Sequence, residues 1–200
     1  MTVTFFLVRH AAHDNLSSYL AGRATRIMLG PAGREQAARL AQRLARERID
    51  KIYTSPRERA YETATAIASA CRLDPPETHD ALDEVDFGSW TGKSFDVLNR
   101  DEQWQRWNMQ RGLAQTPGGE NMLDVQRRMF GLIHSLAGRS EDDRRIVLVS
   151  HCDVIKTVVS HVLCASLDAW ARMEVAPGSI TILVMGNWGA KIITLNEMIS

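Results

Sequence analysis

Two short apolar runs, residues 3–8 and 145–149, constrain the fold of this chain more than any other feature. Both are rich in β-branched residues and have no helical periodicity, so they are predicted as buried strands. The first ends in Arg-His and the second in Ser-His, and helical patterns lie between and after them. This alternation predicts an α/β fold, a three-layer α/β/α sandwich with a mostly parallel central sheet. Polar residues that follow such strands gather at one edge of the sheet, where ligands bind.

The other regular segments fit this architecture. Apolar residues at i, i+3, i+4 and i+7 spacing predict an amphipathic helix over residues 31–44, and a second helix is expected at about 119–137. Residues 51–54 form a further predicted strand. Two β-rich runs, 179–184 and 191–195, flank a turn rich in glycine and predict a C-terminal hairpin.

Two serines stand where helices are expected to begin. Ser55 is followed by Pro56 and Glu58, which predicts a capping box with Ser55 as N-cap and proline at the first helical position. Ser150 and Asp153 have the same spacing, so Ser150 is the predicted cap of the next helix.

Regular periodicity lapses over residues 74–119, which we interpret as an insertion or lid within a single domain of residues 1–200. Trp104 and Trp107 in this region have helical spacing. Core packing is therefore the favoured explanation for them over a lid surface or a dimer contact, and a homodimer is left open as the oligomeric state.

The composition excludes several classes of protein. The 24 basic residues balance 24 acidic ones, so neither nucleic-acid nor membrane-surface binding is indicated. The run at residues 3–8 is too short to span a bilayer or act as a signal peptide. Cys71, Cys152 and Cys164 are odd in number and irregular in spacing, which argues against a disulfide framework. We therefore expect a cytoplasmic protein.

The residues after the strands suggest chemistry on an anion. The guanidinium of Arg9 disfavours a charged imidazole at His10, and a nucleophilic histidine must be neutral. Arg59 stands near a predicted helix N-terminus, an end that attracts anions. Taken alone, each of these residues is explained equally well as a solvated or hydrogen-bonded side chain. Together with His151 they form a set of donors suited to phosphoryl oxygens.

An acidic loop at residues 82–92 holds Asp83, Glu84 and Asp86 among apolar residues. Most acidic loops are simply solvated. A carboxyl group near a bound phosphate dianion would have a raised pKa, which would let it protonate a leaving alkoxide. Composition alone does not choose among the three.

Several motifs together carry a resemblance to a known family. In chain order they are Leu7-Val8-Arg9-His10, Gly22-Arg23, Ser55-Pro56-Arg57-Glu58-Arg59-Ala60, Glu84 with Phe87-Gly88 and Trp90-Thr91-Gly92, Pro117-Gly118-Gly119-Glu120, and Val149-Ser150-His151. In this order and spacing they resemble the histidine phosphatase superfamily, with its phosphoglycerate mutase-like fold, along nearly the whole chain.

The resemblance implies roles for five residues. His10 would attack phosphorus and become a phosphohistidine, while Arg9, Arg59 and His151 would bind the phosphoryl oxygens. Glu84 would protonate the leaving oxygen and then activate water. No metal and no cofactor are implied.

Further pocket residues follow from the same alignment of motifs. The expected substrate-binding positions are Arg9, Arg59, His151, His13, Asn15, Gly22, Arg23 and Cys152. The chain departs from the family pattern where Ala11 and Cys152 replace glycines and where His13 and Leu16 replace the usual Thr and Asn, so a phosphate contact near His13 is altered.

The resemblance implies a metal-independent phosphatase that hydrolyses the phosphate monoester of a small metabolite, such as a phosphoglycerate, a phosphosugar or phosphoserine. Phosphoglycerate mutase-type transfer is an alternative, although this chain is shorter than those mutases. A metal-dependent phosphohydrolase using residues 10–14 is disfavoured by the adjacent Arg9. A phospho-ligand-binding protein without turnover would need neither His10 nor Glu84.

Overall fold

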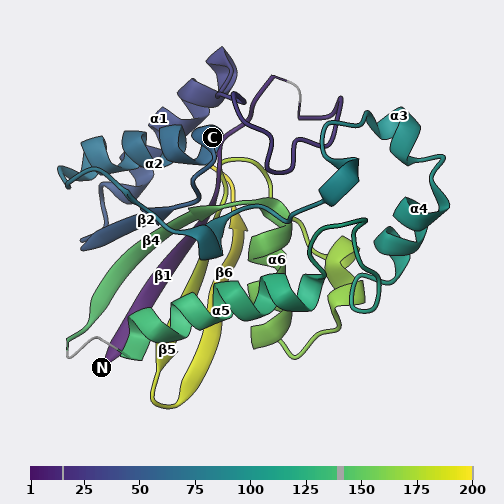
Figure 1. The fold of residues 1–200 in the computed structure, drawn as a ribbon. Helices are drawn as coiled ribbons and strands as arrows, with labels where there is room; N and C mark the ends of the chain where they lie inside the picture. The colour runs from purple at the N-terminus through teal and green to yellow at the C-terminus, as the bar shows by residue number, and fades with distance from the viewer. Residues whose placement is uncertain (15, 139–141, 200) are drawn as a thin grey trace.

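A six-stranded sheet forms the centre of the computed structural model, which describes residues 1–14, 16–138 and 142–199 (Figure 1). The strands are β1 (Thr2–Arg9), β2 (Lys51–Thr54), β3 (Glu77–Thr78), β4 (Arg144–Ser150), β5 (Ile180–Gly186) and β6 (Gly189–Glu197), in the spatial order β3-β2-β4-β1-β5-β6. The first four pair in parallel, and β5 and β6 form an antiparallel C-terminal hairpin. The predicted α/β fold with a mostly parallel sheet is confirmed.

The central strand β1 is buried on both faces over residues 5–8, which explains the unbroken apolar sequence there. Phe5 and Leu7 pack into the core on one face of the sheet, while Phe6 and Val8 pack on the other. β1 pairs with β4 on one side and β5 on the other, so no edge of it is exposed to solvent.

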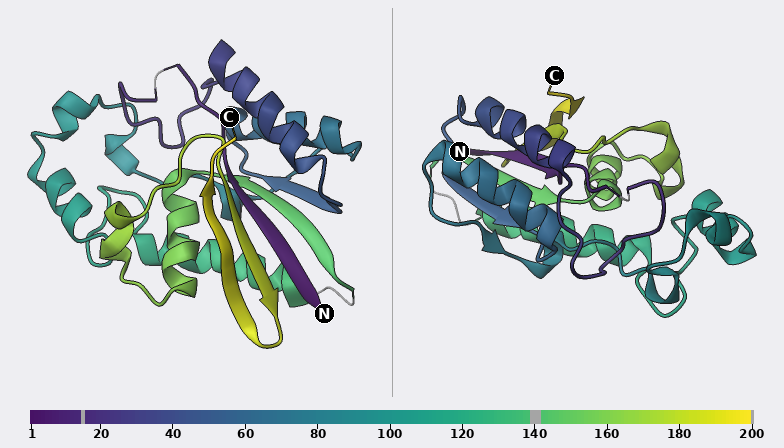
Figure 2. Two further views of the ribbon diagram at one scale, coloured as in Figure 1. Left: turned by 180° about the vertical axis from the view of Figure 1, so that it is seen from behind. Right: turned by 90° about the horizontal axis from the view of Figure 1, so that it is seen from above.

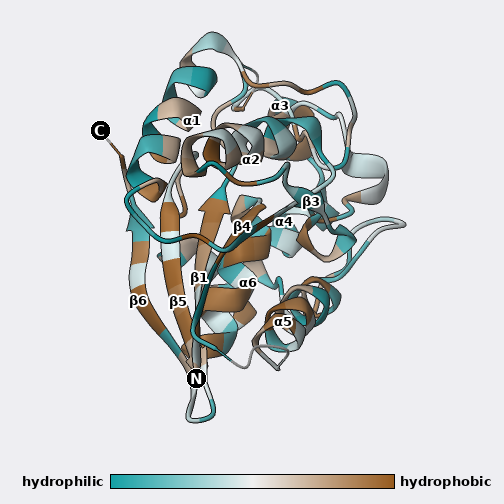
Figure 3. Cartoon of the chain, turned by 90° about the vertical axis from the view of Figure 1, so that its left-hand side faces the viewer, coloured by the Kyte–Doolittle hydropathy of each residue, from teal (hydrophilic) through white to brown (hydrophobic). Residues whose placement is uncertain are grey.

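Helices cover both faces of this sheet, as the views in Figures 1 and 2 show. They are α1 (Pro31–Leu44), α2 (Glu58–Cys71), α5 (Met122–Gly138) and α6 (Cys152–Val162). α1 and α2 share a core with Phe6 and Val8, and α5 and α6 share one with Phe5 and Leu7. Three layers therefore result, and Figure 3 shows hydrophobic strands enclosed by amphipathic helices. Among the described helices, none combines the length and apolar character needed to cross a bilayer.

The segment at residues 74–119 is more regular than its sequence suggests. It contains two 3₁₀ turns (Asp80–Leu82 and Gly88–Trp90) and two short helices, α3 (Phe95–Leu98) and α4 (Glu102–Met109), with a third 3₁₀ segment later at Leu167–Arg172. Ser94 and Asp101 cap α3 and α4 through side-chain hydrogen bonds. Trp104 and Trp107 are 7% and 0% exposed, so their predicted core packing is confirmed.

Both serine caps were predicted wrongly. α2 begins at Glu58 with Arg57 as N-cap, and α6 begins at Cys152 with His151 as N-cap. Ser55 and Ser150 are fully buried. Ser55 Oγ accepts from the Arg57 amide at 3.2 Å and also bonds to His151, while Ser150 donates to the Leu82 carbonyl. Each hydroxyl takes a distant buried partner because an unpaired buried polar group is costly.

Candidate active site

The carboxyl ends of β1 and β4 bring two histidines together. Arg9 is in register with Ser150, and the His10 amide donates to the Ser150 carbonyl at 3.0 Å. The rings of His10 and His151 consequently lie edge to face, 5.1 Å apart. Residues separated by about 140 positions in sequence thus form one site.

Arg59, in the first turn of α2, links these histidines. Its Nε donates to His10 Nε2 at 3.2 Å, and its Nη2 lies 3.3 Å from His151 Nδ1 and donates to the Gly22 carbonyl at 2.8 Å. The side chain is 1% exposed, and its Nη1 has no hydrogen-bond partner within the described residues. The Nε of Arg9 is likewise buried and unpaired there. Since unpaired buried donors are costly, an anion at this site would relieve them.

The hydrogen bonds of His10 define its reactive nitrogen. Nδ1 lies 2.8 Å from the Ala11 carbonyl, which can only accept, so Nδ1 carries the proton and Nε2 the lone pair. Burial, followed by the charges of Arg59 and Arg9, holds the pKa of His10 well below its usual value. At neutral pH His10 is therefore a neutral imidazole with a nucleophilic Nε2.

His151 has the opposite tautomer. Its Nδ1 accepts from Arg59, so the proton lies on Nε2, which donates to Ser55 Oγ at 2.8 Å. Burial and the Arg59 charge lower the pKa of His151 as well. Ser55 therefore orients the ring that faces the site.

Glu84 is the carboxyl group of the acidic loop that enters this site. One oxygen accepts from the Val85 amide at 2.9 Å, and the other lies 3.5 Å from His151 Nδ1. Burial, with a contribution from the charge of Asp153, raises the pKa of Glu84 to about 7. Asp83 instead pairs with Arg57 at 3.0 Å, and Asp86 has a side chain that is 41% exposed.

These groups surround a small cavity of about 130 Å³. Its lining comprises Arg9, His10, His13, Leu16, Tyr19, Leu20, Ala21, Gly22, Arg59, Glu84, Phe87, Phe95, Cys152 and Asp153. Three or more potential metal ligands do not cluster anywhere in the part of the chain that the structure describes. The arrangement can bind a small tetrahedral anion through two arginines and two histidines.

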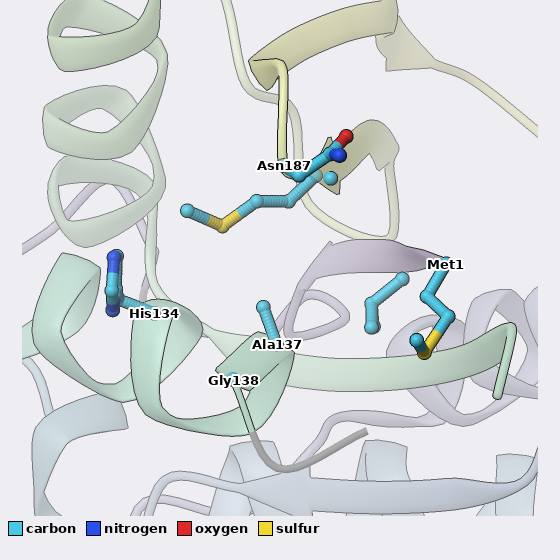
Figure 4. A pocket seen from close by; sticks show the side chains of 8 residues that line it. Met1, His134, Ala137, Gly138 and Asn187 are labelled. Carbon is cyan, nitrogen blue, oxygen red and sulfur yellow. The ribbon is translucent and has the colours of Figure 1, made fainter. Parts of the chain in front are cut away.

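A second cavity, of about 310 Å³, lies near the start of β1, at the other end of the strand from His10. Met1, His134 and Asn187 contribute to its lining (Figure 4). Among the described residues that line this second cavity, His134 has the one ionisable side chain. The described lining therefore contains no arginine that could bind a phosphoryl group.

Three more of the predicted pocket residues, His13, Cys152 and Gly22, line the cavity. His13 is buried and stacks on His10 with ring centroids 6.0 Å apart; burial and the Arg59 charge lower its pKa to about 4. Cys152 also lines the cavity, and burial raises the pKa of its thiol to about 11. Gly22 has φ +49° and no room for a Cβ, which would lie 2.9 Å from Thr91 Oγ1.

Arg23 is not among the described residues that line the cavity. The Arg23 guanidinium pairs with Glu120 at 2.9 Å and donates to the Glu84 carbonyl at 2.8 Å, outside the cavity lining. Asn15 lies outside the described residues.

Sequence reasoning missed two groups around Glu84. Arg128 binds Glu120 at 3.0 Å and also donates to the Glu84 carbonyl at 3.1 Å, so it supports the same loop as Arg23. Asp153, for which the sequence predicts only a capping role, lines the cavity and pairs with Arg111 at 2.7 Å. No local pattern marks either contact, because Arg128 and Arg111 are more than 40 residues from Glu84 and Asp153, respectively.

Comparisons with known proteins agree with this geometry. The family model described as "Histidine phosphatase superfamily (branch 1)" matches residues 5–198. The chain is 29% identical to phosphoserine phosphatase 1 of Hydrogenobacter thermophilus, over 97% of this chain and 92% of that protein. It is 30% identical to the probable phosphoglycerate mutase GpmB of Proteus mirabilis, over 88% and 82% of the two chains. It also matches longer mycobacterial proteins, of which it spans 46%. Among solved structures, Bacillus stearothermophilus YhfR superposes with a TM-score of 0.90 at 27% identity, over 98% of this chain and 97% of that one.

Proposed function

Since this chain belongs to the histidine phosphatase superfamily, we propose that it hydrolyses a small-molecule phosphate monoester through a phosphohistidine on His10. One observation carries the proposal. The neutral Nε2 of His10 faces buried guanidinium donors in the cavity that also contains Glu84, a carboxyl group with a pKa of about 7.

The first step forms a bond from His10 Nε2 to phosphorus and breaks the bond from phosphorus to the ester oxygen. Arg9 and Arg59 stabilise the negative charge on the phosphoryl oxygens. A bound dianion also raises the pKa of His151, so that its Nδ1 can become a donor. Glu84 gives its proton to the departing alkoxide, which leaves as an alcohol.

The second step returns the protein to its starting state. Glu84, now a carboxylate, accepts a proton from water as the water oxygen attacks phosphorus. The bond from phosphorus to nitrogen breaks, inorganic phosphate leaves, and His10 is again neutral. Protons and electrons balance without a metal ion or a cofactor.

Relatives with similar sequences support hydrolysis but leave the substrate open. Their names include phosphoserine phosphatase and glucosyl-3-phosphoglycerate phosphatase, as well as a probable phosphoglycerate mutase. Transfer to a second hydroxyl is the alternative, and it would require an acceptor alcohol to replace water in the second step.

Phosphate release from an aryl phosphate tests the proposal, using wild type and His10→Ala with and without EDTA. We expect activity that survives EDTA, disappears in His10→Ala and persists in a control, His134→Ala, whose side chain is exposed. Acid-labile, base-stable phosphate on the protein would identify the phosphohistidine. Loss of activity with EDTA would favour a metal-dependent enzyme instead, and phosphate binding without any turnover would favour a binding protein.

A further inference from the structure

The active-site cavity has two chemically different ends. Arg9, Arg59 and His10 form the end that would bind the phosphoryl group, where unpaired guanidinium nitrogens are buried. Glu84, the proton donor to the leaving oxygen in the proposed function, therefore marks the side on which the alcohol part of the substrate would lie.

Asp153 is a second carboxyl group on that side. It stands in the first turn of α6 and lines the same cavity as Glu84. After burial, its charge is the strongest influence raising the pKa of Glu84, which agrees with a short separation between the two. Its side chain is 15% exposed and belongs to the cavity lining, so it is accessible to a ligand there.

Arg111 holds this carboxylate in place from behind. Its Nη1 donates to Asp153 Oδ2 at 2.7 Å, and its guanidinium lies 3.8 Å from the ring centroid of Trp170 and 5.0 Å from that of Trp107. Arg111 is 3% exposed and does not line the cavity. Within the described residues, no hydrogen bond reaches Asp153 Oδ1, which leaves an acceptor for a ligand.

Much of the remaining cavity lining is apolar or aromatic and carries no positive charge. These residues are Leu16, Tyr19, Leu20, Phe87 and Phe95. Among the described residues that line the cavity, Arg9 and Arg59 are the cations, and both belong to the phosphoryl end. A carboxylate on the alcohol would lie near Asp153 with no further cation in the described cavity lining to pair with, because Arg111 is already bound to Asp153 from behind, whereas an ammonium group would pair with the free oxygen of Asp153.

We propose that Asp153 binds an ammonium group on the alcohol part of the substrate, so that the preferred substrates are phosphate monoesters of small amino alcohols. The inference rests on the proposed function. It assigns to Asp153 a role in specificity, because Asp153 acts on the leaving group and not on phosphorus.

Three small monoesters that differ in charge test this assignment. Phosphoethanolamine ends in an ammonium group, propyl phosphate in a methyl group and phosphoglycolate in a carboxylate. For wild type we expect kcat/KM to fall in that order. In Asp153→Asn, which keeps the size of the side chain, the ratio of phosphoethanolamine to propyl phosphate should fall about tenfold, as expected for the loss of one charge-assisted hydrogen bond. Asp124→Asn, at a carboxylate of α5 that is 46% exposed and does not line the cavity, is the matched control and should leave the ratio unchanged.

Binding to His10→Ala, measured by calorimetry with the same three esters, separates this inference from the proposed function. The same charge order in binding would support Asp153 as the ammonium site even where no ester is hydrolysed, and the absence of hydrolysis would then count against the proposed function alone. Equal or reversed affinities in binding, or a ratio that Asp153→Asn does not change, would overturn the inference.

Discussion

The Nε2 nitrogen of His10 lies 3.2 Å from Nε of Arg59, and both side chains are almost completely buried. The group that would attack phosphorus and the cation that would receive the phosphoryl oxygens are thus in direct contact before any substrate is present. Burial, together with the charge of Arg59, keeps the pKa of His10 low and the imidazole neutral. It also concentrates positive charge in a buried place, which favours an anionic ligand over solvent.

Substitutions of Arg59, including Arg59→Lys, should reduce kcat/KM by about 10²–10³-fold, because each removes a hydrogen-bond donor that stabilises the transition state. Arg59→Lys should not restore activity, because one ammonium group cannot serve His10, Gly22 and the phosphoryl oxygens together. Steady-state kinetics on an aryl phosphate measure this. Arg127→Lys, at a side chain that is 76% exposed, is the control; equal activity of Arg59→Lys and wild type would contradict the role assigned to Arg59.

Glu84→Gln should separate the two chemical steps. An aryl leaving group needs little protonation, so the phosphohistidine should still form, but its hydrolysis should slow by about 10²–10⁴-fold because water is no longer activated. Rapid-quench measurement should show phosphoenzyme accumulating. A variant that turns over at the wild-type rate without accumulating phosphoenzyme would exclude Glu84 as the acid and base.

The same substitution should change how stability depends on pH. The pKa of Glu84 is about 7 in the folded protein against an ordinary value of 4.5, so the folded state binds this proton more tightly than the unfolded chain. This carboxyl group therefore costs stability as pH rises from about 4.5 through 7. Urea denaturation at pH 5 and pH 8 should show Glu84→Gln gaining stability relative to wild type at the higher pH. A difference that does not vary with pH would show that the pKa is not raised.

Ser55→Ala should lower kcat about tenfold while leaving KM nearly unchanged, because it removes the acceptor that orients His151 and leaves the arginines intact. Ser166→Ala, which alters the cap of a segment that does not line the cavity, provides the comparison. If Ser55 served only the fold, kcat of the correctly folded variant would match that of wild type.

Glu120→Gln should destabilise the protein by about 1–3 kcal/mol, because Arg23 and Arg128 both lose a charged partner in a partly buried network. The Glu84 loop depends on these arginines, so kcat should fall as well. Chemical denaturation measures the change in the free energy of unfolding, and steady-state kinetics measure the change in kcat. For Asp124→Asn, in an exposed pair, a change within about 0.5 kcal/mol is expected.

Cys152 should resist alkylation although it lines the active site. Its thiol pKa is about 11, so it is almost entirely protonated at neutral pH, whereas the thiolate is the reactive form. Iodoacetamide at pH 7.5 should modify the exposed Cys164 first and leave activity intact. Peptide mass mapping that found Cys152 modified first, with loss of activity, would contradict this.

The sequence by itself determined the strands other than β3, the main helices and the three-layer arrangement. Unbroken apolar runs predicted β1 and β4, and helical periodicity predicted α1. These signals are local, because burial of a strand or helix face is written in the spacing of its own residues. The positions of His10 and His151 follow directly, since each comes immediately after a buried strand.

Only the tertiary structure decided how the polar groups pair. Ser55 and Ser150 carry a local capping signal, yet both bond to distant buried partners. Glu84 differs from Asp83 and Asp86 in facing the cavity, and Asp153 faces it because Arg111 holds it there. Burial and ion pairing join residues that are tens of positions apart, and a buried polar group takes whichever partner satisfies it, so no spacing within one segment encodes these choices.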